Sequence, residues 1–152
     1  MTPREELART QASLVAALVA GAPTPPGFDE QLVRATAASL RVKRAGEVAH
    51  AWPALATSLG PQWMSTFASW AAGRPPAGSL RDGWELARSL DRQGTLADAA
   101  RVELATREVR LRYADDGPPR PRRLPAVRRV GAVVVLQLAG RVRTLPLRRD
   151  AA

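Results

Sequence analysis

The sequence predicts a mainly α protein: a bundle of five or six helices followed, after a proline-rich linker, by a C-terminal β-hairpin. Apolar residues recur at helical spacing through most of the 152-residue chain. Four prolines and a glycine then stiffen residues 115–125. A β-branched run at residues 133–135 precedes a candidate two-residue turn, Ala139-Gly140. We therefore divide the chain into a helical domain (1–114), a linker (115–125) and a basic hairpin appendage (126–152).

The first two helices have clear start and stop signals. Thr2 is placed to be an N-cap, Pro3 to occupy the first helical position and Glu5 to complete a capping box, and Gly21 ends the pattern. After a proline-rich loop, Asp29 caps the second helix. The spacing predicts an apolar stripe on each helix, formed by Leu7, Leu14, Val15, Leu18 and Val19 on the first and by Leu32, Val33, Thr36 and Leu40 on the second.

Four further helical segments follow. The apolar pattern restarts around Gly46 and closes at Gly60, and Pro61 opens a segment that ends at Gly73. Ser79 is expected to cap the next helix. The last predicted helix covers residues 95–113 and begins with a capping-box pattern of Thr95 and Asp98. Four tryptophans at helical spacing are expected to contribute mainly to the core: Trp52, Trp63, Trp70 and Trp84.

The predicted hairpin has a defined register. With Ala139-Gly140 as the turn, Leu138 faces Arg141, Val135 faces Thr144 and Val133 faces Pro146. The first strand, residues 131–138, is apolar on both faces and is expected to have a free backbone edge. Such an edge can accept an extended peptide by β-augmentation, and nearby arginines favour acidic peptide residues. The alternative is a hairpin that only packs on its own helices.

The net charge of +9 is unevenly distributed. Residues 1–114 carry 14 basic and 11 acidic side chains, whereas residues 115–152 carry 9 and 3. The excess therefore belongs to a basic C-terminal region and not to a uniformly basic body. This region either is a solvated surface or contacts an acidic partner. For nucleic acid, the pattern predicts only weak, non-specific binding.

Several function classes are excluded or disfavoured by composition. The absence of cysteine excludes disulfides, thiolate metal sites and a cysteine nucleophile. No apolar run approaches the roughly 20 residues of a membrane span. The polar start of the chain does not resemble a signal peptide, so we expect no membrane association and a cytoplasmic location.

The sequence offers no recognisable catalytic or metal-binding set. His50 is the single histidine, and the known hydrolase, zinc and phosphate-loop motifs are missing. We therefore expect no catalytic residue, no cofactor and no metal site. Beside Trp52, His50 is expected to be structural or to lie at a partner surface. The neighbouring basic cluster would either cap helix carbonyls or contact an acidic partner: Arg41, Lys43 and Arg44.

Three blocks, in this order, resemble one protein family over roughly residues 28–113. The first resembles its aromatic-Pro…Leu-Gly…Phe segment: Trp52-Pro53, Leu55, Leu59-Gly60, Trp63 and Phe67. The second resembles its next landmark: Pro75-Pro76, Ser79-Leu80 and Gly83. The third, residues 96–103, resembles its Leu-Ala-Asp-x-Ala-x-x-Glu helix. The family is that of the HvfC/BufC-type proteins, partners of multinuclear non-haem iron oxidative (MNIO) enzymes.

This resemblance implies a non-catalytic subunit that forms a heterodimer with an MNIO enzyme and recruits the leader of a ribosomally made precursor peptide. Iron would belong to the partner enzyme. The resemblance assigns peptide capture to the hairpin: Val133, Val134, Val135, Leu136, Gln137, Arg141 and Arg143. The expected interface with the enzyme comprises Arg41, Lys43, Arg44, His50 and Trp52.

Two alternatives stay open. The first is a DNA-binding or transcription-related protein, because the family's N-terminal domain often has a DNA-binding label and the chain is basic. The arginines, however, are not gathered on one recognition helix. The second is a protein-interaction scaffold that binds no peptide.

Overall fold

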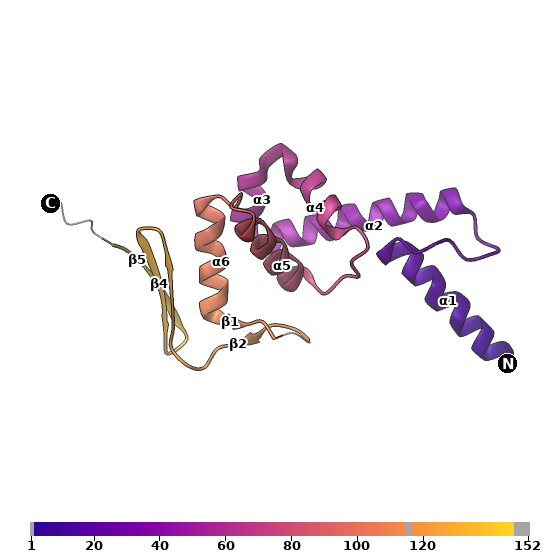
Figure 1. Cartoon of the computed structure of the whole chain (residues 1–152). Helices are drawn as coiled ribbons and strands as arrows, with labels where there is room; N and C mark the ends of the chain where they lie inside the picture. The colour runs from indigo at the N-terminus through magenta and orange to yellow at the C-terminus, as the bar shows by residue number, and fades with distance from the viewer. Residues whose placement is uncertain (1, 115–116, 148–152) are drawn as a thin grey trace.

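The computed structural model describes residues 2–114 and 117–147. It is mainly α with a C-terminal β element, as predicted (Figure 1). The helical part comprises α1 (Pro3–Ala20), α2 (Glu30–Ala51), α3 (Pro53–Leu59), the 3-10 turn η1 (Gly60–Gln62), α4 (Trp63–Ala71), α5 (Ser79–Arg92) and α6 (Asp98–Arg110). The strands are β1 (Leu111–Arg112), β2 (Arg120–Pro121), β3 (Ala126–Val130), β4 (Val133–Leu138) and β5 (Arg141–Pro146).

The molecule is elongated. In Figure 1, α1 and the first half of α2 project at one end, the sheet of β3, β4 and β5 lies at the other, and α6 stands between the sheet and the remaining helices. Helix α6 therefore belongs to both parts of the chain.

The predicted caps of the first two helices are confirmed, and their apolar stripes are buried only in part, as Val33 is buried and Leu18 is half-buried. Thr2 and Glu5 form the capping box, and Gly21 ends α1 in the left-handed conformation. The Asp29 carboxylate accepts a hydrogen bond from the Leu32 N–H at 3.0 Å. Leu7 and Leu32 are nonetheless 59% and 66% exposed, because α1 and the start of α2 extend beyond the bundle.

Other boundaries differ from the prediction. Helix α2 continues through Gly46, since a glycine costs a helix only about 1 kcal/mol and packing can offset it. The neighbouring Ala45 and Val48 are both fully buried. The N-caps of α5 and α6 are Gly78 and Ala97, without side-chain capping, so the capping roles predicted for Ser79 and for Thr95 with Asp98 are wrong. The Thr95 hydroxyl instead donates to the Leu90 carbonyl, 3.3 Å away.

The core of the bundle is built around Trp52. Its side chain is fully buried together with Leu55 and Phe67. Gly83 of α5 lies against the indole so closely that a Cβ there would come within 2.1 Å of the ring. Helices α2 and α5 can therefore meet at this point only because residue 83 has no side chain.

A buried ion pair connects the same two helices. The Arg44 Nε atom donates to Asp82 Oδ2 at 2.7 Å, and the two side chains are 10% and 2% exposed. Arg44 also donates to the carbonyls of Arg74 and Pro75, at 2.8 and 3.3 Å. These bonds satisfy the guanidinium within the fold and fix the loop between α4 and α5.

The β element has a third strand that the sequence analysis did not predict. The antiparallel order is β3-β4-β5, so the expected two-stranded hairpin is the β4–β5 part of a larger sheet. The predicted register is confirmed: Leu138 pairs with Arg141, Val135 with Thr144 and Val133 with Pro146. Within the predicted linker, β2 pairs with β1 directly after α6.

The sheet packs on α6. Val109 of α6 and Val135 of β4 are fully buried in one hydrophobic cluster. Ala105 of α6 belongs to the same cluster and is 4% exposed. A small three-stranded sheet is stable only when one face is covered, and α6 provides this cover. The predicted appendage thus has a hydrophobic contact with the helical bundle.

Candidate functional site

The residues predicted to capture peptide lie on both faces of the sheet. Val133, Val135 and Gln137 alternate on the face that packs on α6, and Val135 and Gln137 are buried. Val134 and Leu136 are half-buried on the opposite face. The strand register places Arg141 and Arg143 of β5 on that outer face as well. The first three residues therefore contribute to packing on α6, and peptide binding by the residues of the outer face stays a prediction.

The free backbone edge predicted for residues 131–138 is contradicted. Strand β4 is the central strand and pairs along its length with both β3 and β5. The prediction failed because β3 was not recognised as a strand. Gly131, with a φ of 54°, begins the two-residue connection that brings β3 beside β4.

The free edges of the sheet belong to β3 and β5. Residues that flank a two-residue hairpin loop form a hydrogen-bonded pair, here Val130 and Val133. Alternation along β3 then directs the backbone N–H and C=O of Val127 and Arg129 away from β4. The Val127 carbonyl already accepts a bond from Arg128 Nη1 at 3.1 Å. The backbone of Arg129 is thus the available pairing position on this edge.

This edge of β3 borders a groove of about 360 Å³ between α5, α6 and the sheet. We call it the β3 groove. Its walls come from all three elements: Arg88, Asp91, Arg101, Leu104, Ala105, Glu108, Arg128, Arg129, Val130 and Gly131. Four arginines against two carboxylates give the β3 groove a net positive charge. A groove of this kind can bind an extended, acidic segment of chain.

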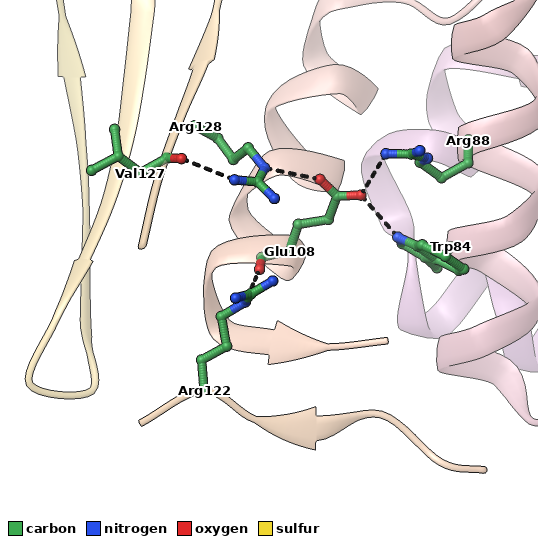
Figure 2. Close-up of polar contacts among 6 residues, drawn as sticks. All are labelled: Trp84, Arg88, Glu108, Arg122, Val127 and Arg128. Carbon is green, nitrogen blue, oxygen red and sulfur yellow. Dashed lines mark hydrogen bonds and ion pairs between the residues drawn. The ribbon is translucent and has the colours of Figure 1, made fainter. Parts of the chain in front are cut away.

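Glu108 is the polar centre of this region (Figure 2). Its Oε1 atom accepts from Trp84 Nε1 at 3.0 Å and from Arg88 Nη1 at 3.2 Å, and Oε2 accepts from Arg128 Nε at 3.3 Å. Arg122 Nε donates to the Glu108 backbone carbonyl at 2.8 Å. One half-buried carboxylate of α6 thus links α5 to β3 and fixes the walls of the β3 groove.

A third arginine of the groove, Arg101, has no well-aligned hydrogen bond at its Nε atom. Arg101 Nε lies 3.2 Å from Asp91 Oδ1, yet this nitrogen is buried without a well-aligned hydrogen bond. Arg101 Nη1 lies 3.7 Å from Asp98 Oδ1. A carboxylate in the groove would give this guanidinium the aligned acceptor that it lacks.

Trp84, which donates a hydrogen bond to Glu108, also stacks on Tyr113. The rings of Trp84 and Tyr113 are stacked, with centroids 4.7 Å apart and an interplanar angle of 6°. Burial raises the pKa of Tyr113 from 10.0 to about 12, with Arg107 opposing the shift and Glu108 adding to it. Tyr113 therefore stays neutral throughout the physiological range and acts as a packing group.

The predicted enzyme interface is only partly on the surface. Trp52 and Arg44 are buried in the core and in the ion pair with Asp82, so their assignment to an interface is wrong. Arg41, Lys43 and His50 are exposed. Sequence alone could not separate Arg44 from its neighbours, because its acceptors lie about 30 or more residues away in the chain.

Sequence reasoning missed an apolar pocket beside these exposed residues. It has a volume of about 200 Å³ and is lined by Leu18, Val19, Leu40, Arg41, Lys43, Arg44, Glu47 and Pro76. Leu40 and Val42 are 39% and 59% exposed. Its lining includes Leu18, Val19 and Leu40, which belong to the apolar stripes predicted on the first two helices, so these stripes were the signal in the sequence.

Neither metal binding nor membrane insertion finds support in residues 2–114 and 117–147. No group of three or more histidine, cysteine or acidic side chains is arranged to hold a metal ion there. No helix in that part of the chain is long and apolar enough to cross a membrane.

The family model described as SCO6045-like, C-terminal domain matches residues 8–92, more than half of the chain. The chain belongs to this family. The SCO6045-like segment runs from α1 to the last residue of α5, so α6 and β3 lie beyond the matched residues.

A UPF0276 protein of Streptomyces avermitilis is 37% identical to the chain over 131 residues. That match covers 82% of this chain and 25% of the Streptomyces protein, so the chain spans about a quarter of its relative's length. A match of this extent necessarily includes α5 and α6. No solved structure matches the chain at a significant level.

Proposed function

We propose that this chain is a non-catalytic accessory subunit that binds an MNIO-type iron enzyme and presents a precursor peptide to it. The observation that carries the proposal is the unpaired edge of β3 beside a positively charged groove. An extended leader peptide would add a strand to β3, and its acidic side chains would meet the arginines of the β3 groove. Iron would be held by the enzyme and not by this chain.

The relatives support an accessory role. The matched family domain is described as a C-terminal domain, and three quarters of the Streptomyces UPF0276 protein lie outside its match to this chain. In that relative, the region similar to this chain accompanies a much larger partner region. The exposed apolar pocket between α1 and α2, with Arg41 and Lys43 at its rim, is the surface that we assign to the enzyme.

The peptide model is tested by removing one backbone donor from each edge of the sheet. Arg129→Pro deletes the N–H that the register directs away from β4, beside the β3 groove, and Arg129→Gln controls for the lost charge. Thr144→Pro deletes the corresponding outward N–H of β5 and is the matched control. Binding of a labelled precursor peptide, encoded beside the gene of this chain, is measured by fluorescence anisotropy in the presence of the enzyme.

We expect Arg129→Pro to weaken peptide binding by about three- to tenfold more than Arg129→Gln does, the equivalent of one net hydrogen bond of about 1 kcal/mol. Thr144→Pro should bind as the unmodified chain does. Circular dichroism checks that all three variants fold. A folded Arg129→Pro variant with undiminished affinity would contradict strand addition at β3.

A further inference from the structure

We propose that a second cationic pocket, separate from the β3 groove, binds a phosphate monoester. We call it the arginine pocket. Its volume is about 400 Å³, and it lies where the end of α6 meets β2 and the β4–β5 turn. Its lining comprises Leu80, Arg107, Arg110, Leu111, Pro121, Arg122, Gln137 and Gly140. Three of these residues are arginines and none is acidic.

The two pockets occupy different sides of α6. The β3 groove uses Arg101, Leu104, Ala105 and Glu108, which recur at helical spacing along one side of the helix. The arginine pocket uses Arg107 and Arg110 of α6, which are rotated by roughly a third to a half of a turn from that side, and Leu111 directly after the helix. A ligand can therefore occupy the arginine pocket without entering the β3 groove.

The arginines of this pocket and those of the β3 groove have different kinds of partner. Arg107 donates to the backbone carbonyl of Ala51 and stacks over the Trp52 ring, 5.4 Å from its centroid. Arg122 is held by the Glu108 carbonyl at 2.8 Å. The Glu108 carbonyl belongs to the C-terminal end of α6, whose dipole is partly negative, so it offsets the charge of Arg122 only in part.

Within residues 2–114 and 117–147, no carboxylate forms an ion pair with Arg107, Arg110 or Arg122. In the β3 groove, by contrast, Arg88, Arg101 and Arg128 each have a carboxylate partner. The arginine pocket thus has three positive charges without a counter-charge from the described chain. An anion is the group that such a pocket attracts.

The number of guanidinium groups favours phosphate over carboxylate. A single arginine can satisfy a carboxylate with two parallel hydrogen bonds, whereas a phosphate offers three oxygens and up to two charges. Leu80, Leu111 and Pro121 add apolar walls for a small organic group attached to the phosphate.

The wall formed by the sheet is also fixed. Gln137 is 2% exposed, and with its amide suitably oriented it bridges the Leu124 carbonyl at 2.9 Å and the Gly140 N–H at 3.1 Å. Arg122 N–H donates to the Arg110 carbonyl at 2.8 Å, which ties β2 to the end of α6. A rigid pocket loses little conformational entropy when it binds a ligand.

The test is isothermal titration calorimetry of the full chain with inorganic phosphate, ribose 5-phosphate and ribose. Arg110→Gln is the informative variant, because this exposed side chain forms no hydrogen bond or ion pair with residues 2–114 and 117–147, and its loss should not unfold the protein. Arg92→Gln, an exposed arginine at the end of α5, removes the same charge elsewhere and is the matched control.

We expect both phosphates to bind and ribose not to bind, with ribose 5-phosphate the tighter ligand. Arg110→Gln should weaken phosphate binding about tenfold and Arg92→Gln less than about twofold, as loss of a charge-assisted hydrogen bond requires. Equal weakening by the two variants would reduce the effect to net charge and overturn the proposal, as would the absence of phosphate binding. If the arginines only cap the end of α6, Arg110→Gln will lower the melting temperature without changing phosphate affinity, which also overturns it.

Discussion

The contact between Gly83 and Trp52 makes one residue decisive for the packing of the bundle. Because a Cβ at position 83 would lie 2.1 Å from the indole, Gly83→Ala must displace the tryptophan or separate α2 from α5. Overpacking of this kind costs about 1–3 kcal/mol or more. We expect a marked fall in melting temperature, measured by circular dichroism.

Gly46→Ala is the matched control for this substitution. Gly46 also lies inside a helix, but a Cβ there would have no neighbour within 4 Å. Alanine should therefore stabilise the protein by about 0.5–1 kcal/mol, because it limits the unfolded chain and favours the helix. If both variants changed stability in the same direction, the Trp52 contact would not be the reason that position 83 is a glycine.

For single residues, the sequence shows which side chains are polar or apolar, but it does not show which distant residues they contact. Trp52 was expected both among the core tryptophans and at an interface, and only the core position is confirmed. Arg44 was grouped with two exposed neighbours and is buried against Asp82. No role was predicted for Glu108, although it forms hydrogen bonds to three other parts of the chain. The partners of these groups are distant in the chain, and no local pattern encodes them.

At the scale of elements, some helix caps and one turn were predicted correctly, since they depend only on residues close together in the sequence. The cap of α1 and the turn at Ala139-Gly140 depend on residues within one turn, and both are confirmed. Strand β3 was missed because two adjacent arginines, Arg128 and Arg129, interrupt its apolar pattern. The β1–β2 pairing was missed because two-residue strands leave almost no pattern to detect.

The β4–β5 turn has a residue in an unfavourable conformation. Ala139 has a φ of 49° and Gly140 a φ of 77°, which is typical of a type I′ turn. The left-handed region costs an ordinary L-residue about 1–2 kcal/mol, and asparagine tolerates it better than alanine. Ala139→Asn should therefore raise the free energy of unfolding by up to about 1 kcal/mol, measured by urea denaturation.

The converse change provides the control for this turn. Gly140→Ala places a Cβ at the second left-handed position and should destabilise the sheet. An unchanged free energy of unfolding in both variants would show that the turn does not limit the stability of the fold.

At the scale of the whole molecule, α6 is the helix on which both the helical bundle and the three-stranded sheet pack. One side of the helix packs on the bundle through Leu104, and another packs on the sheet through Ala105 and Val109. The sequence analysis placed a boundary directly after this helix. The sheet is therefore joined to the helical bundle by direct packing on α6 and not only by the linker.

The charge of the whole molecule yields the last prediction, which concerns DNA. The arginines of the described chain lie on several elements: some line the β3 groove, some the arginine pocket, some the outer face of the sheet, and others are on α1, α2 and α5. They are not gathered on one recognition helix. Scattered cationic contacts with phosphates release counterions but do not read bases. Any binding to DNA should thus be weak and independent of sequence, and each phosphate contact should add about 0.9 to the slope of log affinity against log salt.

Electrophoretic mobility shifts with unrelated duplexes, at several salt concentrations, measure this directly. We expect equal affinities for all duplexes and a loss of binding near physiological salt. A footprint on one defined sequence that survives competitor DNA at that salt would contradict this expectation. It would favour the DNA-binding alternative, because base recognition requires an element placed in a groove of the duplex, and the β3 edge would then have to be considered as that element.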